Sequence, residues 1–118
     1  MILVDTSVWI DHLRRGNLRL KSLLLENSVL THPFILGELA CGRLKNRQMI
    51  MNYLRALPEC VCAAHEEVLF LLENEQLYGR GIGWIDAHLL ASARLSRALI
   101  WTLESRLVRV ASKLGISA

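Results

Sequence analysis

Two acidic residues of this chain directly follow apolar runs that are typical of buried strands. Asp5 follows MILV, and Glu104 follows ALIWTL at residues 98–103. In an open parallel sheet, ligands bind just beyond the carboxyl ends of the strands, so both carboxylates are expected at the binding edge. A hydroxyl pair and a helical pattern come next after Asp5, which leaves two interpretations of this residue open: a helix cap or a metal ligand.

Two further acidic residues fall on apolar helical faces. The neighbours of Glu38 on its own face include Phe34, Ile35 and Cys41, and an ionised group there is costly unless it is paired or bound to a metal. Asp86 shares its face with apolar residues four and seven positions further on. Both have ordinary alternatives: a buried Glu38 satisfied by an arginine, and an Asp86 that stabilises the first turn of its helix.

Convergence of these four carboxylates would favour a cation. Two carboxylates ~4 Å apart repel by about 4 kcal/mol at an effective dielectric constant near 20, whereas a whole domain is stable by only ~5–15 kcal/mol. Oxygen ligands suit hard divalent ions, and Mg²⁺ or Mn²⁺ combines a few carboxylates with waters and phosphate oxygens. The residues alone therefore suggest a divalent metal site at the strand ends.

The elements that must position these residues alternate along the chain. Strands are expected at 1–4, 28–32 and 98–103, with CVCAA (60–64) as a further short strand. Helices are expected at 7–14, 18–26, 33–42, 46–56, 65–78, 84–97 and 105–114. Strands separated by helices predict an α/β domain with a central parallel sheet covered on both faces, and 118 residues predict one domain spanning 1–118.

Composition limits where in the cell the protein is expected to reside. Apolar residues make up 53% of the chain, but no apolar run approaches the ~18 residues of a membrane span. The first apolar run stops after four residues at a charge, so we expect no signal peptide. A cytoplasmic protein with no membrane association, and with a large core or an apolar partner surface, is the expectation.

The basic residues allow two interpretations. The net charge is only +3, which is compatible with an anionic partner but does not establish one. Solvated helix ends explain each cation singly, whereas a rim facing phosphates would explain why two clusters both follow a candidate acidic residue. The clusters are Arg14, Arg15, Arg19 and Lys21, and Arg43, Lys45 and Arg47.

The three cysteines are interpreted as reduced thiols that fill space. Cys60 and Cys62 form C-x-C, which would point to one face of a strand. Zinc needs further ligands at suitable spacing, and neither a second cysteine pair nor an H-x-x-x-H accompanies Cys41 or this motif.

Four ordered blocks resemble the PIN-domain ribonucleases, and specifically the VapC toxins of toxin–antitoxin pairs. The blocks are ILVDTSVWIDHLR, ILGELACG, GIGWIDAHLLASA and LIWTLESRL. They cover nearly the whole chain at family-like spacing. The resemblance implies a PIN-like three-layer α/β/α fold.

The resemblance also implies a metal site. Asp5, Glu38 and Asp86 fall on the three acidic positions of the family's site for Mg²⁺ or Mn²⁺, and Glu104 falls on the fourth. The family usually has aspartate at that fourth position. The longer glutamate reaches further, which puts direct ligation of the metal in doubt.

Two hydroxyl positions of the family match as well. Ser7 and Thr102 fall on positions that line the site, where they would fix the ligand carboxylates. Helix capping by Ser7 and a strand role for Thr102 are the ordinary alternatives, and each is compatible with the family role.

The activity implied is that of a growth-arresting endoribonuclease. Its expected partners are an RNA substrate and a cognate antitoxin, with a toxin homodimer and a toxin–antitoxin hetero-oligomer. A catalytically weak PIN-like module that binds RNA or a partner, its site spoiled by Glu104, is the alternative. A receiver domain needs paired acids after the first strand, and a haloacid-dehalogenase-like phosphatase needs D-x-D where this chain has Ser7.

Overall fold

A three-stranded parallel sheet lies at the centre of the computed structural model, which describes residues 1–118. Its strands are β1 (Ile2–Val4), β2 (Val29–Leu30) and β3 (Leu99–Trp101), in the order β2-β1-β3. Ile2 pairs with Val29 on one side and with Leu99 on the other. The predicted α/β class and parallel sheet are therefore confirmed.

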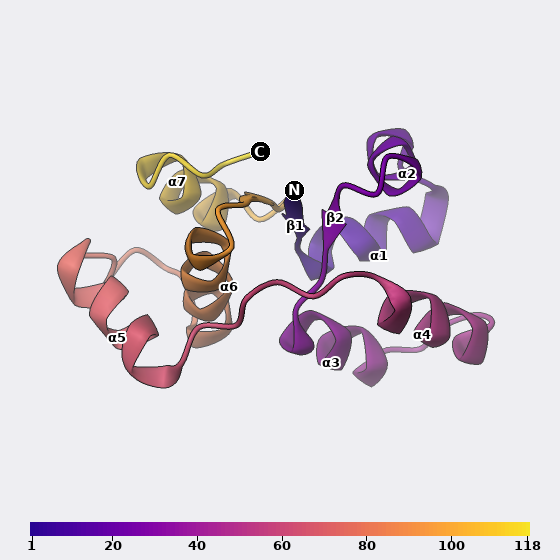
Figure 1. Cartoon of the computed structure of the whole chain (residues 1–118), viewed down its shortest axis with the longest axis horizontal. Helices are drawn as coiled ribbons and strands as arrows, with labels where there is room; N and C mark the ends of the chain where they lie inside the picture. The colour runs from indigo at the N-terminus through magenta and orange to yellow at the C-terminus, as the bar shows by residue number, and fades with distance from the viewer.

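Seven helices cover the sheet. They are α1 (Thr6–Arg15), α2 (Leu18–Leu25), α3 (Pro33–Cys41), α4 (Arg47–Ala56), α5 (His65–Asn74), α6 (Trp84–Leu95) and α7 (Ser105–Lys113). Figure 1 shows α1 to α4 on one side of the strands and α5 to α7 on the other, which gives the three-layer α/β/α arrangement. No helix of the chain is both long enough and apolar enough to cross a membrane.

Helix α6 forms much of the core. Seven consecutive residues, 87–93, are buried, because the helix packs against β3 on one side and α5 on the other. Leu3 and Val4 of β1 and Ile100 of β3 are also buried. The continuous apolar runs of both strands are thus explained by a sheet covered on both faces.

Two sequence expectations about elements are wrong. CVCAA forms no strand, and the only bridge beside it pairs Glu59 with Thr31. The N–H groups of Val61 and Ala63 instead donate to the side-chain hydroxyls of Ser96 and Ser92 on α6 and at its end. Helix side chains replace a neighbouring strand there. Helix α5 ends four residues earlier than expected, at Asn74, and the chain turns at Gln76, where φ is +53°.

Candidate active site

Asp5 lies where β1 passes into α1. Its N–H donates to the carbonyl of Trp101, so the pairing of the two strands fixes its backbone. Asp5 is only 6% exposed and occupies the N-cap position of α1, but its carboxylate makes no capping hydrogen bond. The helix-cap interpretation of this side chain is therefore wrong.

Two hydroxyls hold the Asp5 carboxylate instead. Ser7 Oγ and Thr102 Oγ1 donate to Oδ2 over 2.9 and 2.7 Å. The same hydroxyls accept from the N–H groups of Leu103 and Glu104, each over 3.0 Å. Ser7 therefore does not act as a helix cap. The turn between β3 and α7 orients the Asp5 carboxylate through its Oδ2 atom. The other oxygen of Asp5, Oδ1, has no hydrogen-bond partner.

Glu38 departs from the sequence expectation. It is exposed, and so are Phe34 and Cys41 on its face, while Ile35 alone enters the core. The argument that burial makes its charge costly is therefore wrong. No arginine pairs with it either; Oε1 accepts from Thr6 Oγ1 over 2.8 Å.

Asp86 is partly buried, as its apolar helical face predicts, and it also lies at the start of its helix, as the alternative interpretation predicts. It lies in the first turn of α6, where Oδ2 accepts from the Gly83 N–H over 3.2 Å. Burial raises the pKa of Asp86, and the negative charge of Asp5 raises it further, against the lowering effect of the hydrogen bond from Gly83. When both carboxylates are charged, the charge of Asp5 therefore disfavours the ionised form of Asp86.

Glu104 occupies the N-cap position of α7 without a capping hydrogen bond from its side chain. It is exposed, and its carboxylate has no hydrogen-bond partner. No hydrogen bond or salt bridge fixes the direction of this carboxylate.

One cavity joins these residues. It has a volume of about 460 Å³, and only two of its lining residues are hydrophobic. It is lined by Asp5, Thr6, Ser7, Ile10, Glu38, Gly81, Asp86, Glu104, Ser105, Arg106 and Leu107. No three of the carboxylates bring oxygens within 4.8 Å of one another, so they surround a space rather than touch. An oxygen-only donor set with room for water suits Mg²⁺ or Mn²⁺.

A second cavity beside the first is basic. Its volume is about 300 Å³ and its polar lining is Arg80, Arg106 and Arg109, with no acidic residue. Arg106 lines both cavities and lies across Gly81, where an added Cβ would come 2.6 Å from Arg106 Cδ. Sequence reasoning missed these arginines, because they are separated in the chain and form no run.

Some members of the two basic clusters line a cavity near the carboxylates, and others make contacts elsewhere. Arg14, Arg43 and Lys45 line a third cavity, which shares Glu38 with the first. Arg15 instead forms a salt bridge with Asp11. The remaining members include Arg19, whose guanidinium stacks on Trp101, and Arg47, which donates to the Gly42 carbonyl. The rim hypothesis thus applies to three of the seven cations.

Comparison with known sequences now identifies the family. The family model described as PIN domain matches residues 2–113. The chain belongs to the PIN-domain family. It is also 42% identical over 118 residues to Ribonuclease VapC32 of Mycobacterium tuberculosis, in strains CDC 1551 / Oshkosh and ATCC 25618 / H37Rv, covering 99% of this chain and 95% of each relative. Among PIN domains, it is a member of the VapC ribonuclease family.

Proposed function

We propose that this VapC-family protein is the toxin of a toxin–antitoxin pair and hydrolyses RNA phosphodiester bonds with Mg²⁺ or Mn²⁺ held by its carboxylates. One observation carries the proposal: Asp5, Glu38, Asp86 and Glu104, from separate parts of the chain, line one polar cavity. The family supplies the class of reaction, an endoribonuclease and hydrolase. The cytoplasm, where cellular RNA is exposed, is the proposed compartment.

The residues present fit a divalent ion. Oδ1 of Asp5 has no hydrogen-bond partner, and the raised pKa of Asp86 reflects burial and a neighbouring anion; a cation removes both penalties. Asp5 and Asp86 would hold the ion, with Glu38 and Glu104 in reach of it or of its waters. A bound Mg²⁺ or Mn²⁺ lowers the pKa of water and stabilises negative charge on phosphate oxygens.

The chain's own residues orient the reactants. Ser7 and Thr102 fix the direction of the Asp5 carboxylate. Asp5, Glu38 and Asp86 give the cavity a negative charge that opposes the approach of a phosphate unless a cation neutralises it. No histidine is hydrogen-bonded to a serine or cysteine side chain in this fold, so a protein nucleophile activated by histidine is not part of the proposal.

We propose that Arg106, with Arg80 and Arg109, binds an RNA phosphate adjacent to the scissile one. Guanidinium groups suit phosphate recognition, and these three share a hollow next to the carboxylates. Arg106→Gln should raise the KM for RNA cleavage and reduce the salt dependence of RNA binding by about one charge. Arg55→Gln, an exposed cation of α4 that lines none of these cavities, is the control. Equal effects of both changes would refute a specific subsite.

The role of Glu104 in cleavage is tested by shortening its side chain. Glu104→Asp should preserve or increase cleavage, because the exposed side chain has no partner to lose and aspartate is usual in the family. Initial cleavage rates at saturating Mn²⁺ compare the two proteins. A complete loss of activity would mean that the site depends on the longer side chain.

The proposed partners are an RNA, a cognate antitoxin and a second copy of the chain. Large apolar side chains remain exposed, including Leu18, Leu25 and Phe70 at 84%, 76% and 68%. Exposed apolar side chains that lie together on one surface often mark interfaces, and Leu18 and Leu25 share helix α2. We propose a homodimer that joins antitoxin in a hetero-oligomer, and light scattering with and without antitoxin measures both assemblies.

The nuclease is tested by mapping new RNA ends after brief expression in cells. Discrete cleavage sites that appear with the protein support it. A PIN-like module that only binds RNA or a partner would retain binding and generate no new ends, which is the outcome that would replace the nuclease proposal.

A further inference from the structure

The segment between α4 and α5 passes beside the end of β2. Figure 1 shows it crossing the molecule from the α3 and α4 side to α5. Thr31 N–H donates to the Pro58 carbonyl over 2.9 Å, and Cys60 N–H donates to the Thr31 carbonyl over 2.8 Å. This pairing brings the C-x-C motif next to His32, which precedes α3.

Three potential metal ligands meet there. A ring nitrogen of His32 and the sulfurs of Cys60 and Cys62 all lie within 4.8 Å of one another. No other set of three histidine, cysteine or acidic residues in the chain is so close. His32 and Cys60 are buried and Cys62 is exposed, so the group reaches solvent on one side. Glu59 Oε1 lies 3.8 Å from the Cys62 sulfur and extends the donor set.

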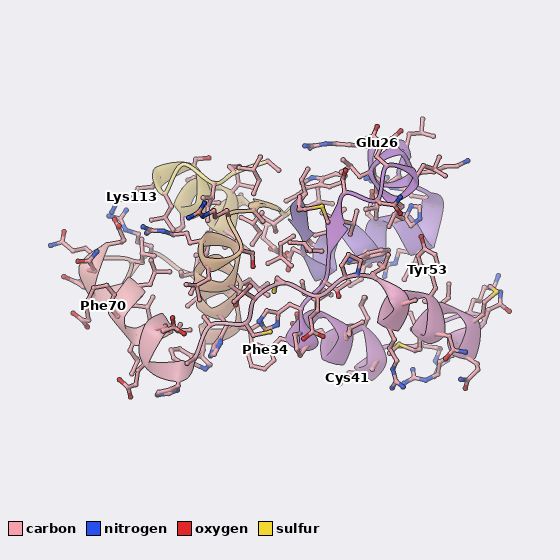
Figure 2. All side chains as sticks on the ribbon, viewed as in Figure 1. Glu26, Phe34, Cys41, Tyr53, Phe70 and Lys113 are labelled. Carbon is pink, nitrogen blue, oxygen red and sulfur yellow. The ribbon has the colours of Figure 1, made fainter.

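His32 supplies a second, independent observation. It is 2% exposed, and Nδ1 accepts the Phe34 N–H over 2.9 Å at the start of α3, where Figure 2 labels Phe34. The other nitrogen, Nε2, is buried without a hydrogen-bond partner. Buried polar atoms without partners are rare and require an explanation.

We propose that His32, Cys60 Sγ and Cys62 Sγ bind a Zn²⁺ ion, with Glu59 or a water as fourth ligand. We assign Nε2 as the His32 ligand atom because Nδ1 already accepts the Phe34 N–H. Nitrogen and thiolate sulfur in tetrahedral sets are typical of zinc, and this set shares no residue with the cavity lined by the four carboxylates. Sequence spacing suggested thiols without a metal because His32 lies 28 positions before Cys60. The fold supplies the missing ligand.

Binding has a defined proton balance. The two thiols release their protons to solvent. The ring proton moves from Nε2 to Nδ1, which replaces the hydrogen bond from Phe34 N–H by two facing donors, so the first turn of α3 must shift away from the ring. That single neutral bond is much weaker than zinc binding in sites of this kind.

Burial disfavours a redox role for the cysteine pair. It raises the pKa of the Cys60 thiol to about 12, and the Cys62 charge adds to the effect. Such a thiol is protonated at neutral pH, so it is a poor nucleophile for disulfide exchange, and zinc must displace its proton to bind.

The test uses Co²⁺ as a spectroscopic substitute for Zn²⁺, under reducing conditions, in the full chain carrying Asp5→Asn to weaken the carboxylate site. One Co²⁺ per chain should bind with sulfur-to-cobalt charge-transfer absorption, and Zn²⁺ should displace it. The Phe34 amide resonance should shift on Zn²⁺ binding.

Two variants remove ligands while sparing the fold. Cys62→Ser changes an exposed residue, and His32→Asn keeps an oxygen to accept the Phe34 N–H. Each should weaken binding at least ~100-fold, because loss of an outer-shell partner alone costs ~10–100-fold. Cys41→Ser, an exposed thiol outside the group, should change nothing.

Three results would overturn the zinc site: no charge-transfer band while all three thiols titrate as free, equal affinity in every variant, or a Cys60–Cys62 disulfide that survives reduction. None of them affects the nuclease proposal, because Mg²⁺-dependent RNA cleavage by the protein with Asp5 intact is measured separately.

Discussion

Asp5→Asn should lower metal-dependent RNA cleavage by at least ~100-fold while leaving the protein folded. Asparagine keeps one oxygen to accept the Ser7 and Thr102 hydroxyls, so the link between the β1 and β3 ends survives. What is lost is the negative charge of a carboxylate fixed at 6% exposure in the centre of the site. Cleavage of a fluorescent RNA with Mg²⁺ or Mn²⁺ measures the loss, and circular dichroism checks the fold.

Asp11→Asn is the matched control, the same chemical change six residues away on α1. Asp11 is held by Arg15 and Asn17 and lines none of the cavities described. Its loss should cost little stability, since the Arg15 partner is exposed to solvent, and should leave cleavage near the level of the unmodified protein. If the two variants cleaved equally well, the carboxylate cavity would not be the catalytic site.

Asp86→Asn should raise the stability of the metal-free protein and abolish cleavage. The pKa of Asp86 is raised overall, so burial and the Asp5 charge outweigh the hydrogen bond from Gly83. A neutral amide keeps an acceptor for that N–H and removes the repulsion. The gain should appear as an increase in Tm, and in a domain of this size each ~1 kcal/mol of stability corresponds to ~3–6 °C. Thermal unfolding in EDTA measures it.

The control for Asp86→Asn is Glu67→Gln. Glu67 occupies the same helical position in α5 and accepts the Ala64 N–H over 2.9 Å, but it is exposed and lies outside the acidic cavity. It loses only a favourable helix-end charge, so its Tm should fall slightly. Millimolar Mn²⁺ should raise the Tm of the unmodified protein by linkage and that of Asp86→Asn by less. A Tm decrease for both variants in EDTA would contradict repulsion within the site.

Sequence reasoning located Asp5 because strand ends can be recognised locally. A continuous apolar run followed by a charge marks the end of a buried strand. Because the carboxyl ends of parallel strands lie at the same edge of the sheet, where ligands bind, this position also predicts a place in the site. Helical periodicity, by contrast, says which residues share a face but not whether that face is buried. Glu38 shows the limit: its apolar neighbours Phe34 and Cys41 are exposed.

Contacts between distant segments could not be read from spacing. The hydroxyls of Ser92 and Ser96 hold the extended segment that the pattern predicted as a strand. Arg106 reaches the site by lying across Gly81. These placements depend on how helices pack, which no local pattern encodes.

The hydrogen bond from Thr102 to Asp5 also bears on the synthesis of a growth-arresting enzyme. Its two residues are 97 positions apart, so Asp5 leaves the ribosome long before the hydroxyl that orients it. The central strand β1 can pair with β3 only after β3, the last strand in the chain, has been synthesised, so the cavity cannot form before then. Long-range pairing of this kind forms late in folding. A nascent chain therefore cannot complete this cavity until almost all of it has been translated.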